Sequence, residues 1–226
     1  MNLVFLHAFP LDERMWEPQL SAFPEAVTPR LYGRGDSLDA WAEELSSDTA
    51  LQGEVAVVGA SMGGYCAQRL LAHAQVRALV LVGARADPDT PERIQARNDT
   101  IRLLRVEGVE ALWERQRPLL FPEDADGDVV GRAGELVLEQ DPEELAAAVA
   151  AMRDRPDSSA LVRETEAKVL VARGEHDPFL GGEEAESLAA SARDGHSHTF
   201  AGCGHLPSLE RPEDFNRVLE EFLARV

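Results

Sequence analysis

Long apolar runs are missing from this sequence. No stretch of about 18 apolar residues occurs, so we expect no membrane-spanning segment. Cysteine is also scarce, since only Cys66 and Cys203 are present and neither belongs to a C-x-x-C pair. A disulfide framework or a metal site is therefore not indicated, and we interpret both cysteines as packing residues. The first residues, MNLVFLHAFP, lack a basic region and a small-residue cleavage site, which predicts no signal peptide and favours a cytoplasmic protein.

Basic residues are few relative to acidic ones. The chain has 22 Lys and Arg against 41 Asp and Glu, which gives a net charge of −19. Such a surface repels nucleic-acid phosphates and anionic lipids, so neither is expected as a partner. We interpret the acidity as a means of solubility rather than as an attraction for cationic ligands. The chain has 226 residues, and 44% of them are apolar. This length and composition suit one compact domain with an insertion.

Six short apolar runs predict β-strands. They cover residues 2–7, 26–32, 54–59, 76–83, 168–174 and 196–201. Most are continuous, as in LVFL and ALVLV, which is typical of strands buried on both faces of a parallel sheet. Helical patterns such as SLDAWAEELSSD and PEDFNRVLEEFLARV lie between and after them. Strands that alternate with helices predict an α/β sheet with right-handed crossovers.

One segment interrupts this alternation. Residues 87–166 contain helical spacing and no convincing strand, as in PERIQARNDTIRLLRVEGVEALWERQRPLL. We therefore expect a core formed by residues 1–86 and 167–226, with residues 87–166 inserted as a helical cap.

A serine between glycines follows the third of these runs. The stretch VAVVGASMGGYCAQRLL contains G-x-S-x-G, in which Gly59 and Gly63 flank Ser61. This pattern between a strand and a helix is typical of a nucleophile elbow, where the glycines avoid the collisions of a sharp turn. The alternatives are a plain turn with a capping serine, and a phosphate loop, which is disfavoured because no lysine follows the glycines.

A nucleophilic serine needs a base to take its proton. Of the six histidines, His205 is the preferred candidate because it lies in a glycine-rich loop after the last strand. A carboxylate should orient this base, and Asp177 directly follows the strand in AKVLVARGEHDPF. Glu175 and Asp141 are the alternatives. The order Ser, Asp, His is the order found on α/β-hydrolase scaffolds.

An oxyanion would need two N–H donors. Met62 directly follows the serine, and Phe9 lies in the loop after the first strand, so their N–H groups are the candidates. The Phe9 side chain can also be interpreted as part of the wall of the substrate pocket.

Five stretches in order along nearly the whole chain resemble the α/β-hydrolase superfamily, particularly its small esterase, enol-lactonase and haloperoxidase-like branch. They are FLHAFPLDERMW, YGRGDS, VVGASMGGYCA, VARGEHDPF and GCGHLPSLERPEDFNRVLEEFL. The resemblance implies Ser61 as nucleophile, His205 as base, Asp177 as orienting acid and a helical cap over the site. The first loop departs from the usual His-Gly-x because Ala8 replaces the glycine. The family sheet usually has eight strands, so we expect a shortened, mostly parallel sheet of about six, whose edge a partner subunit could cover in a homodimer.

These features together predict a serine hydrolase that cleaves small carboxylic esters or lactones through an acyl-enzyme, with no cofactor and no metal. Two alternatives remain open. One is a carbon–carbon bond hydrolase or lyase of the same fold, and the other is a ligand-binding signalling protein that retains the triad.

Overall fold

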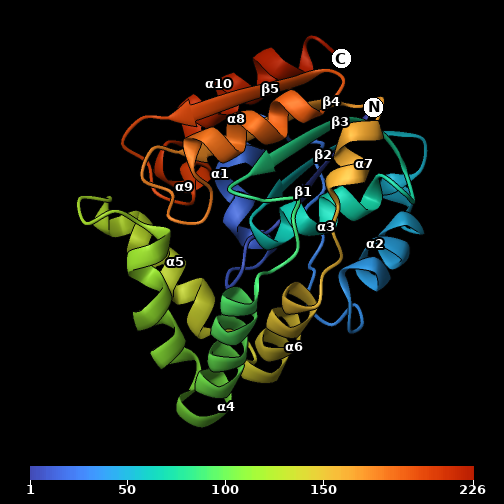
Figure 1. The fold of residues 1–226 in the computed structure, drawn as a ribbon. Helices are drawn as coiled ribbons and strands as arrows, with labels where there is room; N and C mark the ends of the chain where they lie inside the picture. Colours follow the sequence, from blue (N-terminus) through green and yellow to red (C-terminus); the bar gives the residue numbers. More distant parts are fainter.

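A parallel sheet of five strands forms the centre of the molecule (Figure 1), seen in a computed structural model that describes residues 1–226. The strands lie in the order β1-β2-β3-β4-β5, and every neighbouring pair is parallel. Their bounds are Asn2–Leu6 for β1, Glu54–Ala60 for β2, Gln75–Val82 for β3, Lys168–Gly174 for β4 and Gly195–Phe200 for β5. All their carboxyl ends therefore meet at one edge, where open α/β sheets bind ligands.

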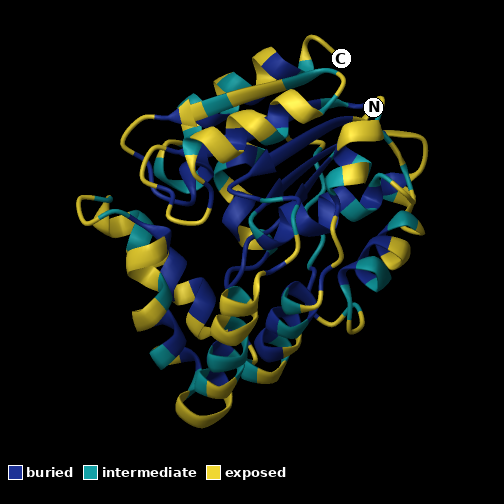
Figure 2. Cartoon of the chain, viewed as in Figure 1, coloured by how far each residue is buried: buried dark blue, intermediate teal, exposed yellow.

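The central strands are buried on both faces because their side chains are almost all apolar. In β2, every residue after Glu54 is buried, β4 is buried after Lys168, and β3 is buried from Ala78 onward. The edge strand β5 is different, since its sequence GHSHTF is mostly polar and only Phe200 is buried. Figure 2 shows the central strands in dark blue between more exposed helices.

The expected strand at residues 26–32 does not form, so the sheet has five strands where about six were expected. Only Val27 pairs with the sheet: its N–H donates to Leu3 O, and its carbonyl accepts from the Phe5 N–H, both at 2.9 Å. Pairing ends there because Pro29 lacks an N–H and cannot continue a ladder. The other five strands lie within one residue of their expected bounds, and the sheet is wholly rather than mostly parallel.

Helices cover both faces of the sheet. Helix α3 (Met62–Leu70) packs on β1, β2 and β3, and α8 (Gly182–Ser191) packs on β4 and β5. Helix α2 (Leu38–Ser46) lies against α3. An aromatic cluster joins the sheet to α10 (Pro212–Leu223), because Phe215 lies 5.8 Å from Phe200 and 6.1 Å from Trp16 between ring centroids. Shorter helices complete these layers: η1 (Glu13–Trp16), α1 (Glu17–Leu20), η2 (Thr49–Leu51) and α9 (Pro207–Glu210).

The insertion between β3 and β4 is helical, as expected. It contains α4 (Pro91–Leu120), α5 (Gly127–Leu138), α6 (Pro142–Arg153) and α7 (Ser159–Glu164). Helix α4 consists of two helices joined at Gly108, whose φ of 86° breaks the helical path. Helices α4, α5 and α6 form the layer below the sheet in Figure 1, whereas α7 packs against α3 and α8 beside it. The boundary of the cap at residue 166 stays a prediction. Even α4, the longest helix, is too rich in charged residues to cross a bilayer.

Candidate active site

Ser61 lies in a sharp turn between β2 and α3. Its φ of 49° and ψ of −111° make it the only non-glycine residue with a positive φ. The Ser61 N–H donates to Val82 O at 2.7 Å, which fixes the turn to the end of β3. A conformation of this kind costs about 1–3 kcal/mol and is retained where the surroundings enforce it. The geometry is that of a nucleophile elbow.

Three glycines around Ser61 leave the room that this turn needs. A Cβ on Gly59 would lie 2.4 Å from Gly63 O, and a Cβ on Gly63 would lie 2.2 Å from Leu6 O. Backbone atoms cannot move aside as a flexible side chain can, which is the collision expected from the sequence. Gly64, which the sequence motif does not single out, is equally restricted, because a Cβ there would lie 2.4 Å from the Ala84 Cβ.

His205 and Asp177 lie side by side and are both buried. The His205 Nδ1 atom is 2.9 Å from Asp177 Oδ1, and the two side chains are 2% and 0% exposed. The distance is that of a hydrogen bond, although the angle at Nδ1 is not that of a regular one. Asp177 Oδ1 also accepts from the Phe179 N–H at 2.8 Å, which fixes the carboxylate. The sequence-predicted base and acid are therefore brought together.

The end of β3 links this pair to the serine turn. Val82 accepts the hydrogen bond from Ser61, and the next residue, Gly83, packs against the pair. A Cβ on Gly83 would lie 2.6 Å from His205 Cε1 and 2.8 Å from Asp177 Oδ2. The three candidate residues thus come from the carboxyl ends of β2, β4 and β5 and meet around the end of β3.

The loop that carries His205 is held by groups that sequence reasoning missed. The Glu210 carboxylate accepts from the N–H groups of Gly204 at 2.9 Å and Leu206 at 3.2 Å, on either side of the histidine. The His205 N–H itself donates to Leu120 O at the end of α4, at 2.9 Å. Burial raises the pKa of Glu210. The sequence could have indicated this role, because Glu210 lies five residues after the histidine and shortly before the proline that begins α10.

The loop that carries Asp177 has a similar support. The buried Arg173 guanidinium donates to Glu175 O at 2.9 Å and to Leu180 O at 2.7 Å, so it brackets the aspartate. The sequence could have indicated that Arg173 supports this loop, because it is an arginine near the end of the mostly apolar strand β4.

The alternative acids are engaged elsewhere. The Glu175 carboxylate is exposed and accepts from the Gly202 N–H at 2.9 Å. Asp141 caps α6 by accepting from the N–H groups of Glu143 and Glu144 at 2.8 and 3.0 Å. Neither carboxylate contacts a histidine, so Asp177 is the acid that the geometry favours.

His7, the second fully buried histidine, has a structural environment. Its Nε2 accepts from the Leu31 N–H at 2.9 Å, which assigns the proton to Nδ1. Burial lowers the pKa of His7 to about 4, so the ring is neutral near pH 7. It therefore joins the loop after β1 to residue 31 without carrying charge.

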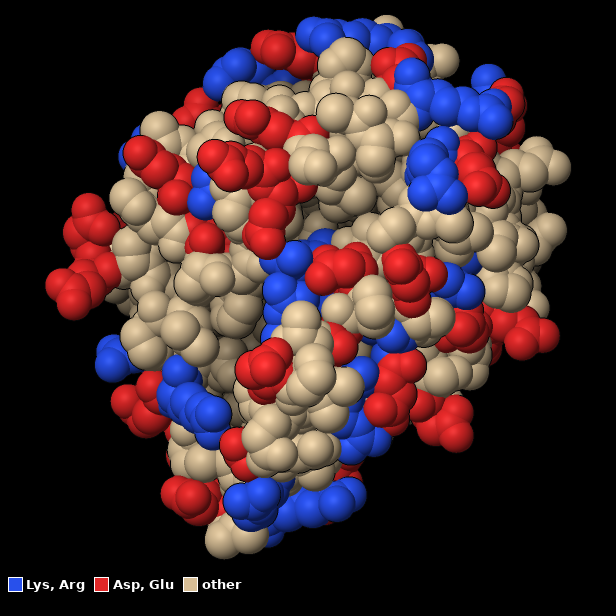
Figure 3. All heavy atoms as spheres, viewed as in Figure 1, with Lys and Arg blue, Asp and Glu red and all other residues tan.

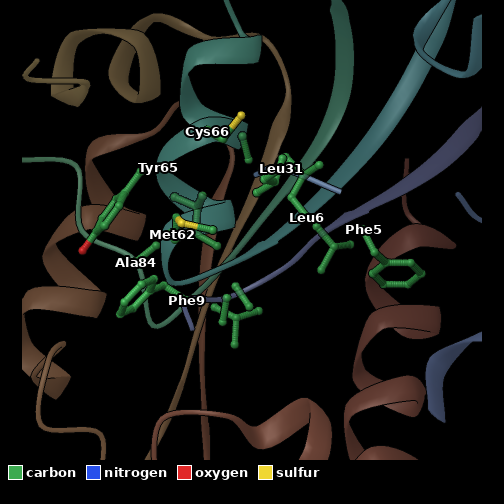
Figure 4. Packing of buried hydrophobic residues seen from close by; sticks show 14 of the residues in the cluster. Phe5, Leu6, Phe9, Leu31, Met62, Tyr65, Cys66 and Ala84 are labelled. Atoms are coloured by element: carbon green, nitrogen blue, oxygen red, sulfur yellow. The ribbon is translucent and has the colours of Figure 1, made fainter. Parts of the chain in front are cut away.

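Two backbone N–H groups near Ser61 lack an acceptor within the chain. Met62 is the first residue of α3, where helical N–H groups have no partner, and Phe9 lies in the loop after β1. The neighbouring Ala8 N–H is directed to the Met15 sulfur at 3.1 Å. Figure 4 shows the side chains of Phe9, Met62 and Ala84 gathered near the start of α3. The N–H groups of Phe9 and Met62, the donors expected from the sequence, thus have no acceptor within the chain.

Both cysteines are free and buried. Burial raises the pKa of Cys66 to about 12 and that of Cys203 to about 11, so both thiols stay protonated near pH 7. No three side chains of His, Cys, Asp or Glu converge in a way that could hold a metal ion.

A strained serine at the end of one strand of a parallel sheet, with a carboxylate and a histidine after two later strands of the same sheet, defines the α/β-hydrolase class of enzyme. A family model described as "Alpha/beta hydrolase family" matches residues 3–218, and the chain belongs to this family. The resemblance stated from the sequence and the enzyme class are thereby confirmed.

Individual relatives are similar over nearly their whole length. A pimeloyl-[acyl-carrier protein] methyl ester esterase from Aromatoleum aromaticum is 26% identical and is aligned over 97% of both chains. The structure of a thermophilic esterase from Thermogutta terrifontis, with malate bound, has a TM-score of 0.92 at 29% identity, covering 100% of this chain and 90% of that one. The enol-lactonase from Burkholderia xenovorans shares the fold, with a TM-score of 0.85 at 21% identity and coverage of 99% and 91%.

Proposed function

We propose that this chain is a serine hydrolase that cleaves small carboxylic esters or lactones, with Ser61 as nucleophile, His205 as base and Asp177 as the orienting acid. The observation that carries the proposal is the buried contact of 2.9 Å between His205 and Asp177, next to the strained serine turn. A buried carboxylate stabilises the imidazolium that forms when histidine takes a proton.

The first half of the reaction acylates the serine. Because Nδ1 faces Asp177, Nε2 is the ring nitrogen left to take the Ser61 proton. Ser61 Oγ attacks the carbonyl carbon, and the carbonyl π electrons move to the oxygen. The tetrahedral intermediate then collapses, the bond to the alkoxy oxygen breaks, and this oxygen takes the proton from His205. An alcohol leaves from an ester, whereas in a lactone it remains attached to the acyl group.

The second half restores the enzyme. A water molecule gives a proton to His205 and attacks the acyl carbon, and collapse of the second intermediate returns the proton to Ser61 Oγ. Ester and water thus become acid and alcohol. The N–H groups of Phe9 and Met62 stabilise the oxyanion in both steps, and one such donor contributes about 2.7–4 kcal/mol to lowering the barrier.

The names of the relatives support esters as the substrate class. Two proteins that align with nearly the whole of this chain are called esterases, and the substrate named for one of them is a methyl ester. Lactones enter the proposal because ring opening uses the same steps, and an enol-lactonase has the same fold.

Turnover of ester and lactone substrates of graded acyl length tests the proposal, with Ser61→Ala as the blank. We expect the unaltered protein to hydrolyse short 4-nitrophenyl esters and the blank to lose about 10⁴-fold or more of this activity. Equal rates for the two proteins would refute the serine mechanism. Correctly folded protein that turns over no ester or lactone would favour carbon–carbon bond cleavage or ligand sensing instead.

A further inference from the structure

A pocket of about 420 Å³ opens beside the candidate active site, between α4 and the core. One of its walls touches the site directly, because the ring of Phe179 makes an edge contact with His205 at 4.6 Å between centroids. Another lining residue, Tyr65, lies in the first turn of α3, four residues after Ser61. A substrate with its ester at Ser61 could therefore extend another part of its structure into this pocket.

The pocket is positively charged, although the chain carries a net charge of −19. Four arginines line it against two acidic residues, which gives a local net charge of +2. The arginines are Arg85, Arg93, Arg97 and Arg115, and the acids are Asp89 and Glu184. Figure 3 shows Lys and Arg side chains in the middle of this face, between the sheet layer and the helices below it. Because the rest of the surface repels anions, a local excess of arginine is what would admit one.

The acidic residues nearby do not neutralise all of these arginines. Arg85 is paired twice, with Asp87 at 2.8 Å and Glu184 at 2.7 Å. Arg93 shares the same Asp87 at 3.1 Å. Arg115 makes no ion pair with any acidic side chain, and it lines the pocket as an exposed residue of α4. Asp87 and Glu184 thus balance the charges of Arg85 and Arg93, and Arg115 is the lining arginine that has no acidic partner.

Ion pairs of a buried carboxylate hold the side chains at the back of the pocket. Asp89 is buried and pairs with the buried Arg155 at 2.7 Å and with Arg97 at 3.1 Å. The Arg155 guanidinium lies 4.2 Å from the centroid of the Tyr65 ring, so it also fixes this wall of the pocket. One buried carboxylate thus faces two guanidinium groups, so this cluster adds a positive charge to the pocket and holds Arg97 in place. Arg115 is free of ion pairs, and Arg93 shares the half-exposed Asp87 with Arg85, so these two arginines of α4 are the groups that we expect to bind a ligand.

We infer that this pocket binds a carboxylate of the substrate, so that the enzyme prefers esters that carry a negative charge away from the scissile bond. The inference rests on the proposed function, because the pocket selects substrates for the same serine. Guanidinium groups suit this task, since they stay charged and offer two parallel N–H donors to a carboxylate.

A matched pair of substrates tests the inference. Mono-(4-nitrophenyl) glutarate has a free carboxylate, and its methyl-capped ester has the same acyl chain without the charge. The measured quantity is the ratio of kcat/KM for the anionic over the neutral ester. We expect a ratio above one that falls with added salt, because screening weakens the attraction.

Variants of arginines on α4 show which side chains produce the preference for the anionic ester. Arg115→Gln should lower the ratio about threefold and Arg93→Gln/Arg115→Gln about tenfold, mainly through KM, while the neutral ester is hydrolysed as before. Arg117→Gln is the matched control, because Arg117 lies on the same helix but lines a different groove, with Trp113 and Phe121. The control should leave the ratio unchanged.

The outcomes separate the two proposals. Hydrolysis of both esters with a ratio near one, or with a ratio that the double variant does not change, overturns the carboxylate pocket and leaves the serine mechanism standing. Absence of Ser61-dependent turnover overturns the proposed function. Calorimetry with glutarate and the Ser61→Ala protein at low salt then still tests the pocket. Binding that is lost in Ser61→Ala/Arg93→Gln/Arg115→Gln supports it, and no binding refutes it.

Discussion

Gly83 offers a way to disturb the candidate pair without replacing either of its members. Its φ of 61° favours glycine, and a Cβ there would lie 2.6 Å from His205 Cε1 and 2.8 Å from Asp177 Oδ2. Carbon and oxygen atoms do not approach this closely, so Gly83→Ala must displace the imidazole, the carboxylate or the turn by several tenths of an ångström. A misplacement of about 1 Å can cost about 100-fold in turnover. We expect a loss of this order for a short 4-nitrophenyl ester.

Gly53 is the matched control for backbone strain. Its φ of 77° is equally unfavourable for alanine, but a Cβ there would meet nothing within 4 Å. It precedes β2, at the opposite end of the strand from Ser61. A left-handed alanine costs about 1–2 kcal/mol, so Gly53→Ala should lower Tm by about 2–8 °C and leave turnover per folded molecule intact.

Thermal melting and turnover of both variants give the comparison. The expected result is a loss of stability in both and a loss of turnover in Gly83→Ala alone. If the two variants keep the same turnover, contact of Gly83 with His205 and Asp177 does not matter for activity, and the geometry proposed for the site is wrong.

Three further changes test separate parts of the account. Asp177→Asn should fold normally, as judged by circular dichroism, and lose about 10⁴-fold in kcat, whereas near-normal activity would exclude Asp177 as the orienting acid. Glu210→Ala removes the acceptor for two N–H groups beside His205, so kcat should fall more than KM changes, and Glu210→Gln should recover part of it. For His7, burial lowers the pKa from 6.5 to about 4. The unfolded chain therefore binds the proton more readily, and about 3 kcal/mol of stability, present above pH 6.5, should be lost as pH falls toward 4. Denaturant unfolding from pH 7 to 4 should show a shallower loss in His7→Gln, and an unchanged pH dependence would contradict this assignment.

Local patterns explain which parts of the fold were predictable. Four of the five strands are short apolar runs bounded by polar or glycine residues, so the sequence pattern locates each to within one residue. The fifth, β5, is mostly polar, and it too lies within one residue of its expected bounds. Residues 26–32 share the apolar character but contain Pro29, whose effect on pairing outweighs side-chain preference. The kink of α4 at Gly108 could also be suspected from a glycine within a helical pattern, although its position depends on packing.

The candidate site was predictable where a residue follows a strand directly. Ser61, Asp177 and His205 each come at or soon after a strand end, and parallel strands bring such ends together. The supports of these loops could not be predicted in the same way. Glu210 and Leu120 approach His205 from a different helix and from the insertion, and the positive pocket needs arginines from both sides of the junction. Contacts of this kind follow from tertiary packing, which spacing in a single sequence does not reveal.

A homodimer was expected because the shortened sheet would have an open edge for a partner subunit to cover. Val27 pairs with β1 and so covers one position of the edge that was expected to be open. The homodimer stays a prediction.

Covalent labelling tests the central claim most directly, that Ser61 is the activated nucleophile. The protein is treated with a fluorophosphonate, digested, and the adduct is mapped by mass spectrometry. We expect one adduct, on Ser61, formed much more slowly in His205→Ala because the base that takes the serine proton is missing. An adduct on another residue, or no adduct on correctly folded protein, would contradict it.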